Sequence, residues 1–161
     1  MRRIVMSAFS LLVLTAAAGI ASAQSPHFVK ADVGFSGSGA NLSVTFKESG
    51  LGDNLLVNLT ASADASAVYA CINNGGNHPQ ATNKETVSSA VSASGTFSVK
   101  NGTTSGTLTL TPPEPGSFSC PNGQRLVLSS VTYSNVAITD TTNNVSKSFA
   151  GIFTRTLFPI P

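Results

Sequence analysis

The sequence predicts a single antiparallel β-sandwich, immunoglobulin-like in outline, with a small β-barrel as the alternative. Apolar and polar residues alternate over short segments from about residue 27 onwards, and clusters of Gly, Asn, Pro and Ser separate these segments. No segment has a convincing helical pattern. The spacing of Cys71 and Cys120 is compatible with a staple between two sheets, although the chain has no Trp to supply the buried Trp of true immunoglobulin domains.

The first 23 residues have the organisation of a secretory signal peptide. Arg2 and Arg3 form a positive start, an uncharged apolar run covers residues 4–20, and Ala21-Ser22-Ala23 is a small-residue cleavage signal. A membrane anchor is the alternative, but the run is short for a span and no basic cluster follows it. We therefore expect residues 24–161 to be one secreted domain, extracellular or, in a host with an outer membrane, periplasmic. The Ala-rich leader is typical of a bacterial host.

The expected secreted domain is close to neutral. The chain has 9 Lys+Arg and 7 Asp+Glu, and removal of Arg2 and Arg3 leaves seven basic against seven acidic residues. The remaining basic residues are spread singly, so no basic stripe is left to bind nucleic acid or an anionic membrane. Charged residues make up only 10% of the chain. Because Ser, Thr, Asn and Gly fill the polar positions, we expect a solvent face of hydroxyls and amides.

The alternating segments predict seven to nine short strands. The expected strands cover residues 27–35, 41–47, 55–61, 67–72, 87–100, 107–111, 125–140 and 147–158. Leu42, Val44 and Phe46 share one face of the second segment, and Leu55, Val57 and Leu59 share one face of the third. The segment 125–140 changes phase between Leu128 and Val131, which predicts a bulge or break near Ser129–Ser130.

Turn residues separate these segments. We expect turns at residues 36–39, 50–54, 101–106, 121–124 and 141–146, each rich in Gly or Asn. The proline-rich stretch 112–116 cannot lie in a central strand and must bridge elements. The apolar end, residues 151–161, is predicted to pack as a last strand in the core; an exposed apolar edge that binds a partner is the alternative.

Two cysteines in an exported chain predict one disulfide, Cys71–Cys120. Closing a loop of about fifty residues is worth roughly 4 kcal/mol in the chain-entropy model. The spacing excludes a CxxC redox motif. A zinc site would need His27 and His78 to join both cysteines, and this spacing matches no zinc finger. We expect no metal and no cofactor.

The candidate ligand site is an amide-rich loop, residues 71–85, with the sequence CINNGGNHPQATNKE. Asn and Gly accept the positive φ that tight turns need, so a purely structural turn is the favoured interpretation. The disulfide would hold this loop near the turn that follows Cys120. A polar rim would then form from Asn73, Asn74, Asn77, His78, Gln80, Asn122 and Gln124. Such amides bind sugar hydroxyls or supply carbonyls to Ca²⁺, but the loop has no aromatic platform and only Glu85 as a carboxylate.

Catalytic motifs are missing from the sequence. His78 could serve as a general base oriented by Glu85, but no nucleophile stands out among the many Ser and Thr residues. The segment GSFSC, residues 116–120, is not the G-x-S-x-G of a nucleophile elbow. We therefore expect a protein that is not an enzyme.

Four segments together resemble a group of small secreted bacterial proteins of unassigned function. They are YACINNGGNHPQATNKE, FSCPNGQ, VLSSVTYSNVAITDTTN and FAGIFTRT, and the similarity runs from about Tyr69 to Leu157. The specific parts are the Cys-Asn-Gly loop and the turn that begins at Ser119-Cys120. The resemblance implies secretion, one disulfide and an all-β domain, and it brings no catalytic or binding residue.

The sequence does not identify the function, and three hypotheses remain. The first is a secreted, non-enzymatic binding or structural module at the cell surface or in the extracellular space, with an extracellular protein or glycan as partner. The second is a small extracellular hydrolase that uses His78 with a carboxylate. The third is an inhibitor of an extracellular enzyme that presents residues 112–123 as its contact loop.

Overall fold

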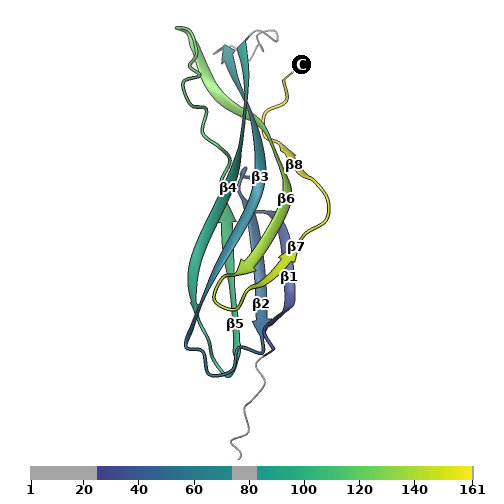
Figure 1. The fold of residues 1–161 in the computed structure, drawn as a ribbon. Helices are drawn as coiled ribbons and strands as arrows, with labels where there is room; N and C mark the ends of the chain where they lie inside the picture. Colours follow the sequence, from purple (N-terminus) through teal and green to yellow (C-terminus); the bar gives the residue numbers. More distant parts are fainter. Residues whose placement is uncertain (1–24, 74–82, 161) are drawn as a thin grey trace, which may run out of the picture.

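The computed structural model describes residues 25–73 and 83–160, which form eight antiparallel strands (Figure 1). The strands are β1 His27–Phe35, β2 Leu42–Ser49, β3 Leu56–Asn73, β4 Lys84–Ser98, β5 Thr103–Leu110, β6 Gln124–Asp140, β7 Val145–Ser148 and β8 Phe153–Thr156. Over the ranges described, no helix is long and apolar enough to cross a membrane.

The strands form two open sheets that pack as a sandwich. One sheet has three strands in the order β1-β2-β5, and the other has five, in the order β4-β3-β6-β7 with β8 also paired to β6. The predicted sandwich is therefore confirmed, and the alternative of a closed barrel is wrong. Figure 1 shows that β3, β4 and β6 continue beyond the three-stranded sheet, so the sandwich occupies only one end of the molecule.

Period-two alternation builds the three-stranded sheet as predicted. Leu42, Val44 and Phe46 of β2 are buried, as are Leu108 and Leu110 of β5, because these side chains face the second sheet. The ring of Phe46 meets that of Phe97 edge to face, with centroids 4.9 Å apart. Gly106 lies against both rings, and a Cβ at this position would collide with Phe97. The glycine is therefore part of the packing between the sheets.

β3 is one strand of 18 residues rather than the two predicted segments. The two predicted segments stop at Ala61 and resume at Ala67, and the inward positions across this break are the alanines 61, 63, 65 and 67, all buried. Alanine has a low preference for strands, which made this stretch look like a break. Leu55 does not share the inward face with Val57 and Leu59: it precedes the strand and is 81% exposed.

β6 contains two bulges, of which one was predicted. Its pairing with β3 shifts between Val68 and Tyr69, which leaves Ser129 as the extra residue and confirms the predicted irregularity. The pairing of β3 with β6 shifts a second time between Ser62 and Asp64. Here Ala63 of β3 lies opposite two residues of β6, Asn135 and Val136. Asn135 has a φ of 52°. This second bulge changes the direction of the Asn135 side chain on the outer face.

Two predicted turns are shorter than expected. Asn101 and Gly102 alone turn the chain, with φ of 50° and 69°, and residues 103–106 already belong to β5. Likewise β7 begins at Val145, directly after Asn144. The Pro-rich stretch 112–116 bridges β5 and β6 outside any strand, as predicted.

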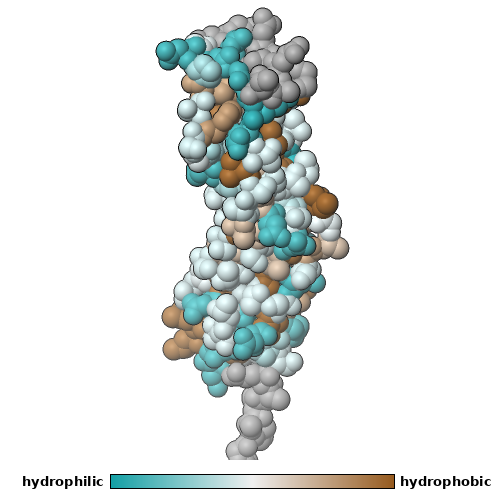
Figure 2. Space-filling model, turned by 45° about the horizontal axis from the view of Figure 1, so that its top comes forward, coloured by the Kyte–Doolittle hydropathy of each residue, from teal (hydrophilic) through white to brown (hydrophobic). Residues whose placement is uncertain are grey.

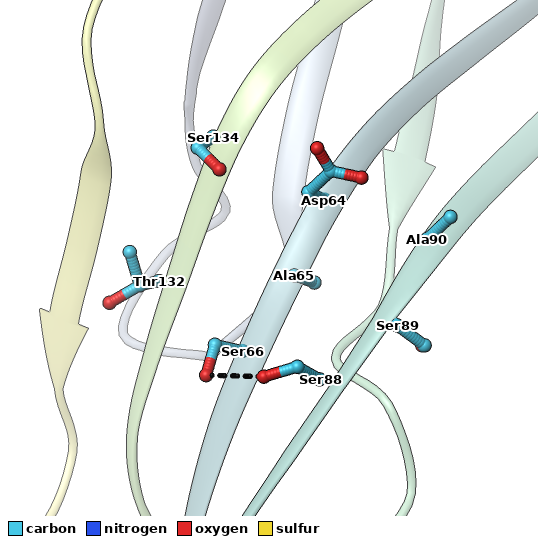
Figure 3. Close-up of a pocket in the computed structure, with 8 residues that line it drawn as sticks. All are labelled: Asp64, Ala65, Ser66, Ser88, Ser89, Ala90, Thr132 and Ser134. Atoms are coloured by element: carbon cyan, nitrogen blue, oxygen red, sulfur yellow. Dashed lines mark hydrogen bonds between the residues drawn. The ribbon is translucent and has the colours of Figure 1, made fainter.

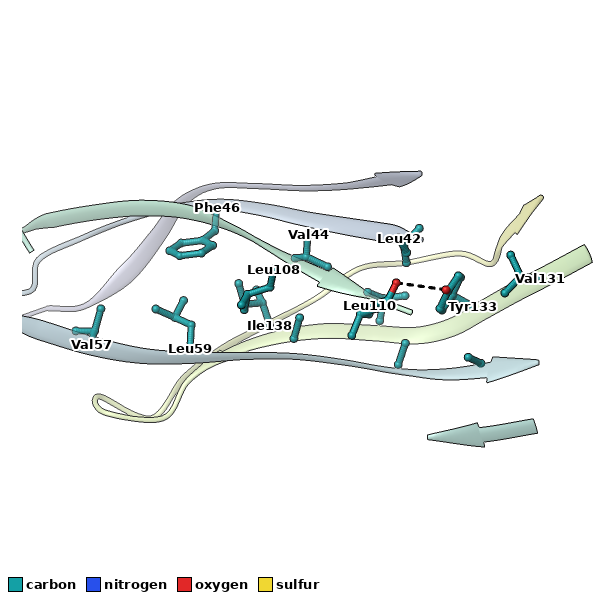
Figure 4. Packing of buried hydrophobic residues seen from close by; sticks show 14 of the residues in the cluster. Leu42, Val44, Phe46, Val57, Leu59, Leu108, Leu110, Val131, Tyr133 and Ile138 are labelled. Atoms are coloured by element: carbon teal, nitrogen blue, oxygen red, sulfur yellow. Dashed lines mark hydrogen bonds between the residues drawn. The ribbon is translucent and has the colours of Figure 1, made fainter. Parts of the chain in front are cut away.

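The main core lies between the two sheets (Figure 4). Its members are Leu42, Val44, Phe46, Leu51, Val57, Leu59, Ala61, Ala63, Ala65, Leu108, Leu110, Val131, Tyr133, Val136 and Ile138. Tyr133 is fully buried, and its hydroxyl donates to the carbonyl oxygens of Ala40 (3.0 Å) and Leu110 (3.4 Å). These hydrogen bonds connect Tyr133 of the five-stranded sheet to Leu110 at the end of β5 and to Ala40 just before β2, both on the side of the three-stranded sheet.

A second buried group lies where β3 and β6 extend beyond the sandwich. Tyr69, Cys71 and Ile72 are buried there without belonging to the main core. The disulfide Cys71–Cys120 forms as predicted, with Cα atoms 5.5 Å apart. It joins β3 to the connection before β6 and not to the other sheet, so its expected role as a staple across the sandwich is wrong.

The chain end is tied to this same region through Ser129. The backbone N–H groups of Leu157 and Phe158 donate to the Ser129 carbonyl (2.8 and 3.0 Å), and the Ser129 hydroxyl donates to the Phe158 carbonyl (2.8 Å). Of the apolar end, Phe153 packs against the main core, as predicted, whereas Ile152 is 70% exposed.

Candidate functional site

The predicted amide rim is only partly covered by the described residues. Its members Asn74, Asn77, His78 and Gln80 lie outside them. Asn73 ends β3 and pairs with Gln124 at the start of β6, and Asn83 Nδ2 donates to Gln124 Oε1 (3.3 Å). Asn73 and Asn83, the described residues on either side of 74–82, thus lie at the disulfide end, while the rim itself stays a prediction. Asn122 is exposed in the adjoining turn.

Glu85, the carboxylate that the hydrolase hypothesis pairs with His78, lines a polar hollow of about 370 Å³. The other lining residues are Pro115, Ser117, Phe118 and Ser119 from the connection before β6. Because His78 lies outside the described residues, its pairing with Glu85 stays a prediction.

A second polar surface lies on the outer face of the five-stranded sheet. Neighbouring strands there carry hydroxyls that bond across the sheet: Thr60 with Ser94 (2.8 Å), Ser66 with Ser88 (3.0 Å), Thr132 with Thr154 (3.1 Å) and Thr139 with Ser146 (2.8 Å). In Figure 2 much of the visible surface has the pale colour of such residues. The predicted face of hydroxyls therefore includes the outer side of β3, β4, β6, β7 and β8.

This hydroxyl face is hollowed along its central strand. One hollow, of about 390 Å³, is lined by Asp64, Ala65, Ser66, Ser88, Ser89, Ala90, Thr132 and Ser134 (Figure 3). A second, of about 320 Å³, is lined by Ser62, Ala63, Asp64, Ala90, Val91, Ser92 and Asn135. Asp64 and Ala90 line both, so the two form one shallow groove that follows β3. We call this the serine groove.

Asp64 is the one charged residue among the described residues that line the serine groove. Asn135 Nδ2 donates to its Oδ2 at 2.7 Å. Asn135 reaches Asp64 because the second bulge of β6 places it, at positive φ, opposite the middle of β3. The bulge therefore fixes the position of the only carboxylate in the groove.

Two other carboxyl groups meet inside the sandwich, at the end opposite the disulfide. Glu48 of β2 and Asp140 of β6 are both fully buried. Asp140 accepts the backbone N–H groups of Thr142 (2.8 Å) and Asn143 (3.2 Å) and the Asn143 side-chain amide (2.6 Å). No N–H group or hydroxyl of another residue donates to the carboxyl oxygens of Glu48, but a protonated Glu48 can donate to the Asp140 carboxylate. Burial, and next the charge of Asp140, raise the pKa of Glu48 to about 7.

This carboxyl pair has the chemistry of a proton donor but no access for a substrate, because both side chains are closed off from solvent. Within residues 25–73 and 83–160, no three His, Cys, Asp or Glu side chains gather as metal ligands. The serine groove contains hydroxyls and one carboxylate, without a histidine beside them. Its arrangement can hydrogen-bond a ligand, and the Asp64 carboxylate is the one possible general base among its described lining residues.

Comparison of the chain with known protein families, with curated proteins and with solved structures finds no match.

The sequence did not single out the serine groove because Ser and Thr occur in every segment. One signal was available. In the sequence, the apolar residues Tyr133 and Val136 are three positions apart, so the period-two alternation changes phase between them, as it does between Leu128 and Val131. Both side chains are buried in the structure. That signal locates the second bulge, and with it Asn135.

Proposed function

We propose that this protein is a secreted, non-enzymatic module that binds a neutral, hydroxyl-rich glycan along the serine groove. The observation that supports this most strongly is the row of short hydroxyl side chains on β3, β4 and β6 around a shallow groove. Each Ser or Thr hydroxyl both donates and accepts hydrogen bonds, as a sugar hydroxyl does, so the two surfaces match chemically.

The small size of the lining residues supports a ligand that lies along the sheet. Ser and Ala side chains lose little conformational entropy when a ligand covers them, so binding needs less compensation than on a surface of long side chains. The groove is open and follows a strand, which suits an extended polymer better than a small enclosed molecule. No aromatic ring is among its described lining residues, so we expect weak binding per sugar unit.

The charge of the groove supports a neutral ligand. Asp64 would repel an acidic polymer, and among the described lining residues there is no Lys or Arg to attract one. Asn135 donates to Oδ2 of the Asp64 carboxylate, which leaves Oδ1 to accept a hydrogen bond from a sugar hydroxyl.

Secretion and an immunoglobulin-like outline are part of the same proposal. The disulfide is compatible with an oxidising compartment, which supports secretion after removal of residues 1–23. The strand orders β1-β2-β5 and β4-β3-β6-β7 support the immunoglobulin-like outline.

The test is a titration of the oxidised protein with soluble neutral polysaccharides, followed by calorimetry and thermal unfolding, with an acidic polysaccharide for comparison. Ala90 is exposed and lines both hollows, so Ala90→Arg should fill the groove across Asp64 and abolish binding. Ser146→Arg on the exposed β7 is the matched control and should bind as the parent does. Equal binding by both variants would rule out the groove as the site.

A second candidate function, inhibition of an extracellular hydrolase by residues 112–123, is favoured by how that segment is held. Cys120 ties it to β3, and Tyr69 Oη donates to the Pro113 carbonyl (2.8 Å). A contact loop held at two points loses less entropy on binding. Residual activity of representative peptidases and glycosidases, measured with the parent and with Phe118→Ala, tests it; no inhibition by either protein would dismiss it.

A further inference from the structure

We propose that the edge strand β4 pairs with β4 of a second copy of this chain, which joins two five-stranded sheets into one continuous sheet. The proposal rests on the edges of the sheets and does not require glycan binding, although Ser88, Ala90 and Ser92 of β4 also line the serine groove. An edge strand presents unpaired N–H and C=O groups, and natural proteins usually protect such edges with charges, bulges, proline or short strands.

Three of the edge strands carry such protection. β1 has a register shift between Phe28 and Lys30, and the exposed ion pair Lys30–Asp32 (3.2 Å) lies on it. β7 and β8 are four residues long, and they contain Lys147 and Arg155 respectively. These features oppose the addition of another strand at any of these three edges.

β4 has none of these devices over most of its length. It pairs with β3 from Leu56↔Ser98 to Ala70↔Lys84 without a register shift. No charged residue and no proline occurs from Thr86 to Ser98. In Figure 1, β4 forms the outer border of the large sheet on the left. Every second residue of this strand directs its backbone N–H and C=O away from β3.

The remaining edge, β5, is partly covered by the end of β4. Thr104 Oγ1 donates to the Ser98 carbonyl (2.9 Å), and the Phe97 ring lies against Gly106. The open stretch is therefore Thr86–Thr96 of β4. Its exposed outward residues include Thr86, Ser88, Ala90, Ser92, Ser94 and Thr96.

A second copy fits this edge because the strand is compatible with itself. When two copies of β4 run antiparallel about Val91, Ser94 faces Ser88 and Thr96 faces Thr86 on the polar outer side. The inward Val87 then faces the inward Gly95. Between Thr86 and Thr96 there is no charge to repel its equal, and the two-fold contact is closed, as in most homodimers.

Sedimentation equilibrium of the purified, oxidised protein over a wide concentration range tests the proposal. We expect a reversible dimer. Ser92→Lys brings two like charges close to the two-fold axis, and should weaken the dimer by about tenfold or more. Ser146→Lys adds the same charge at the opposite border of the sheet and should leave the dimer unchanged.

Cysteine cross-linking keeps the test decisive if Ser92→Lys does not fold. The described residues include no free cysteine, so a mixture of Ser88→Cys and Ser94→Cys proteins should oxidise to a cross-linked heterodimer faster than Ser146→Cys forms a homodimer. A protein that stays monomeric up to its solubility limit would overturn the proposal. Equal effects of the two lysine variants, or equal cross-linking at position 146, would also overturn it.

Discussion

The two ends of this molecule are held together in different ways. At the sandwich end, where β1, β2 and β5 cover the large sheet, a continuous apolar core fills the space between two sheets. At the disulfide end, β3 and β6 extend beyond that core, and a disulfide, the Tyr69–Pro113 hydrogen bond and the bonds of Ser129 to the chain end hold irregular segments against them. Regular packing stabilises the first end, and a few specific links stabilise the second.

This difference bears on where function lies. Loops commonly carry binding residues, which is why the amide rim at the disulfide end was the natural candidate. The sandwich end instead offers a surface whose side chains are fixed by strands on a packed core, and such surfaces position hydrogen-bonding groups with less loss of entropy. The serine groove lies on that rigid part of the sheet.

Removal of the disulfide is expected to have the largest effect. The double variant Cys71→Ser/Cys120→Ser should lose up to about 4 kcal/mol in the free energy of unfolding, because the open loop gains entropy in the unfolded chain. Urea unfolding measures this loss. Unchanged stability would mean that the disulfide end is held by its other contacts.

The next effect is a pH dependence at the sandwich end. The pKa of Glu48 is raised from 4.5 to about 7, so the folded protein holds a proton that the unfolded chain has released. Its contribution to stability is complete below pH 4.5, falls as the pH rises towards 7, and is lost above that. The pKa shift corresponds to at most about 3 kcal/mol.

Glu48→Gln tests this effect because it removes the ionisation and keeps the size of the side chain. The variant should be more stable than the parent above pH 7 and similar to it below pH 4.5. Glu85→Gln, at an exposed carboxyl, is the control. If the stability difference between Glu48→Gln and the parent does not change with pH, Glu48 is not protonated in the folded protein.

The smallest effects come from two tyrosine hydroxyls, one at each end. Tyr69→Phe and Tyr133→Phe should each cost about 1 kcal/mol, because each leaves a buried carbonyl without its donor. In the Cys71→Ser/Cys120→Ser variant, Tyr69→Phe should change the free energy of unfolding by a different amount than in the parent, because Tyr69 and Cys120 hold the same segment. Tyr133→Phe should add independently. Equal coupling of both tyrosines to the disulfide would show that the two ends behave as one unit.

Much of the fold could be predicted from the sequence where side chains alternate clearly. Leu42, Val44 and Phe46 indicated β2, and the change of phase after Leu128 indicated the Ser129 bulge. β3 was predicted in two pieces because its inward residues between Ala61 and Ala67 are small and carry little hydrophobic signal. A face of hydroxyls was expected from composition, but its groove depends on the pairing of three strands.

A map of backbone amide chemical shifts, recorded while a neutral oligosaccharide is added to the oxidised protein, tests directly whether the serine groove is the binding site. Binding in the serine groove should shift the amides of Asp64, Ser66, Ser88 and Ser134. Those of Asn73, Asn122 and Gln124 at the disulfide end should not move. Shifts confined to the disulfide end would contradict the proposed site and favour the amide rim as the binding site.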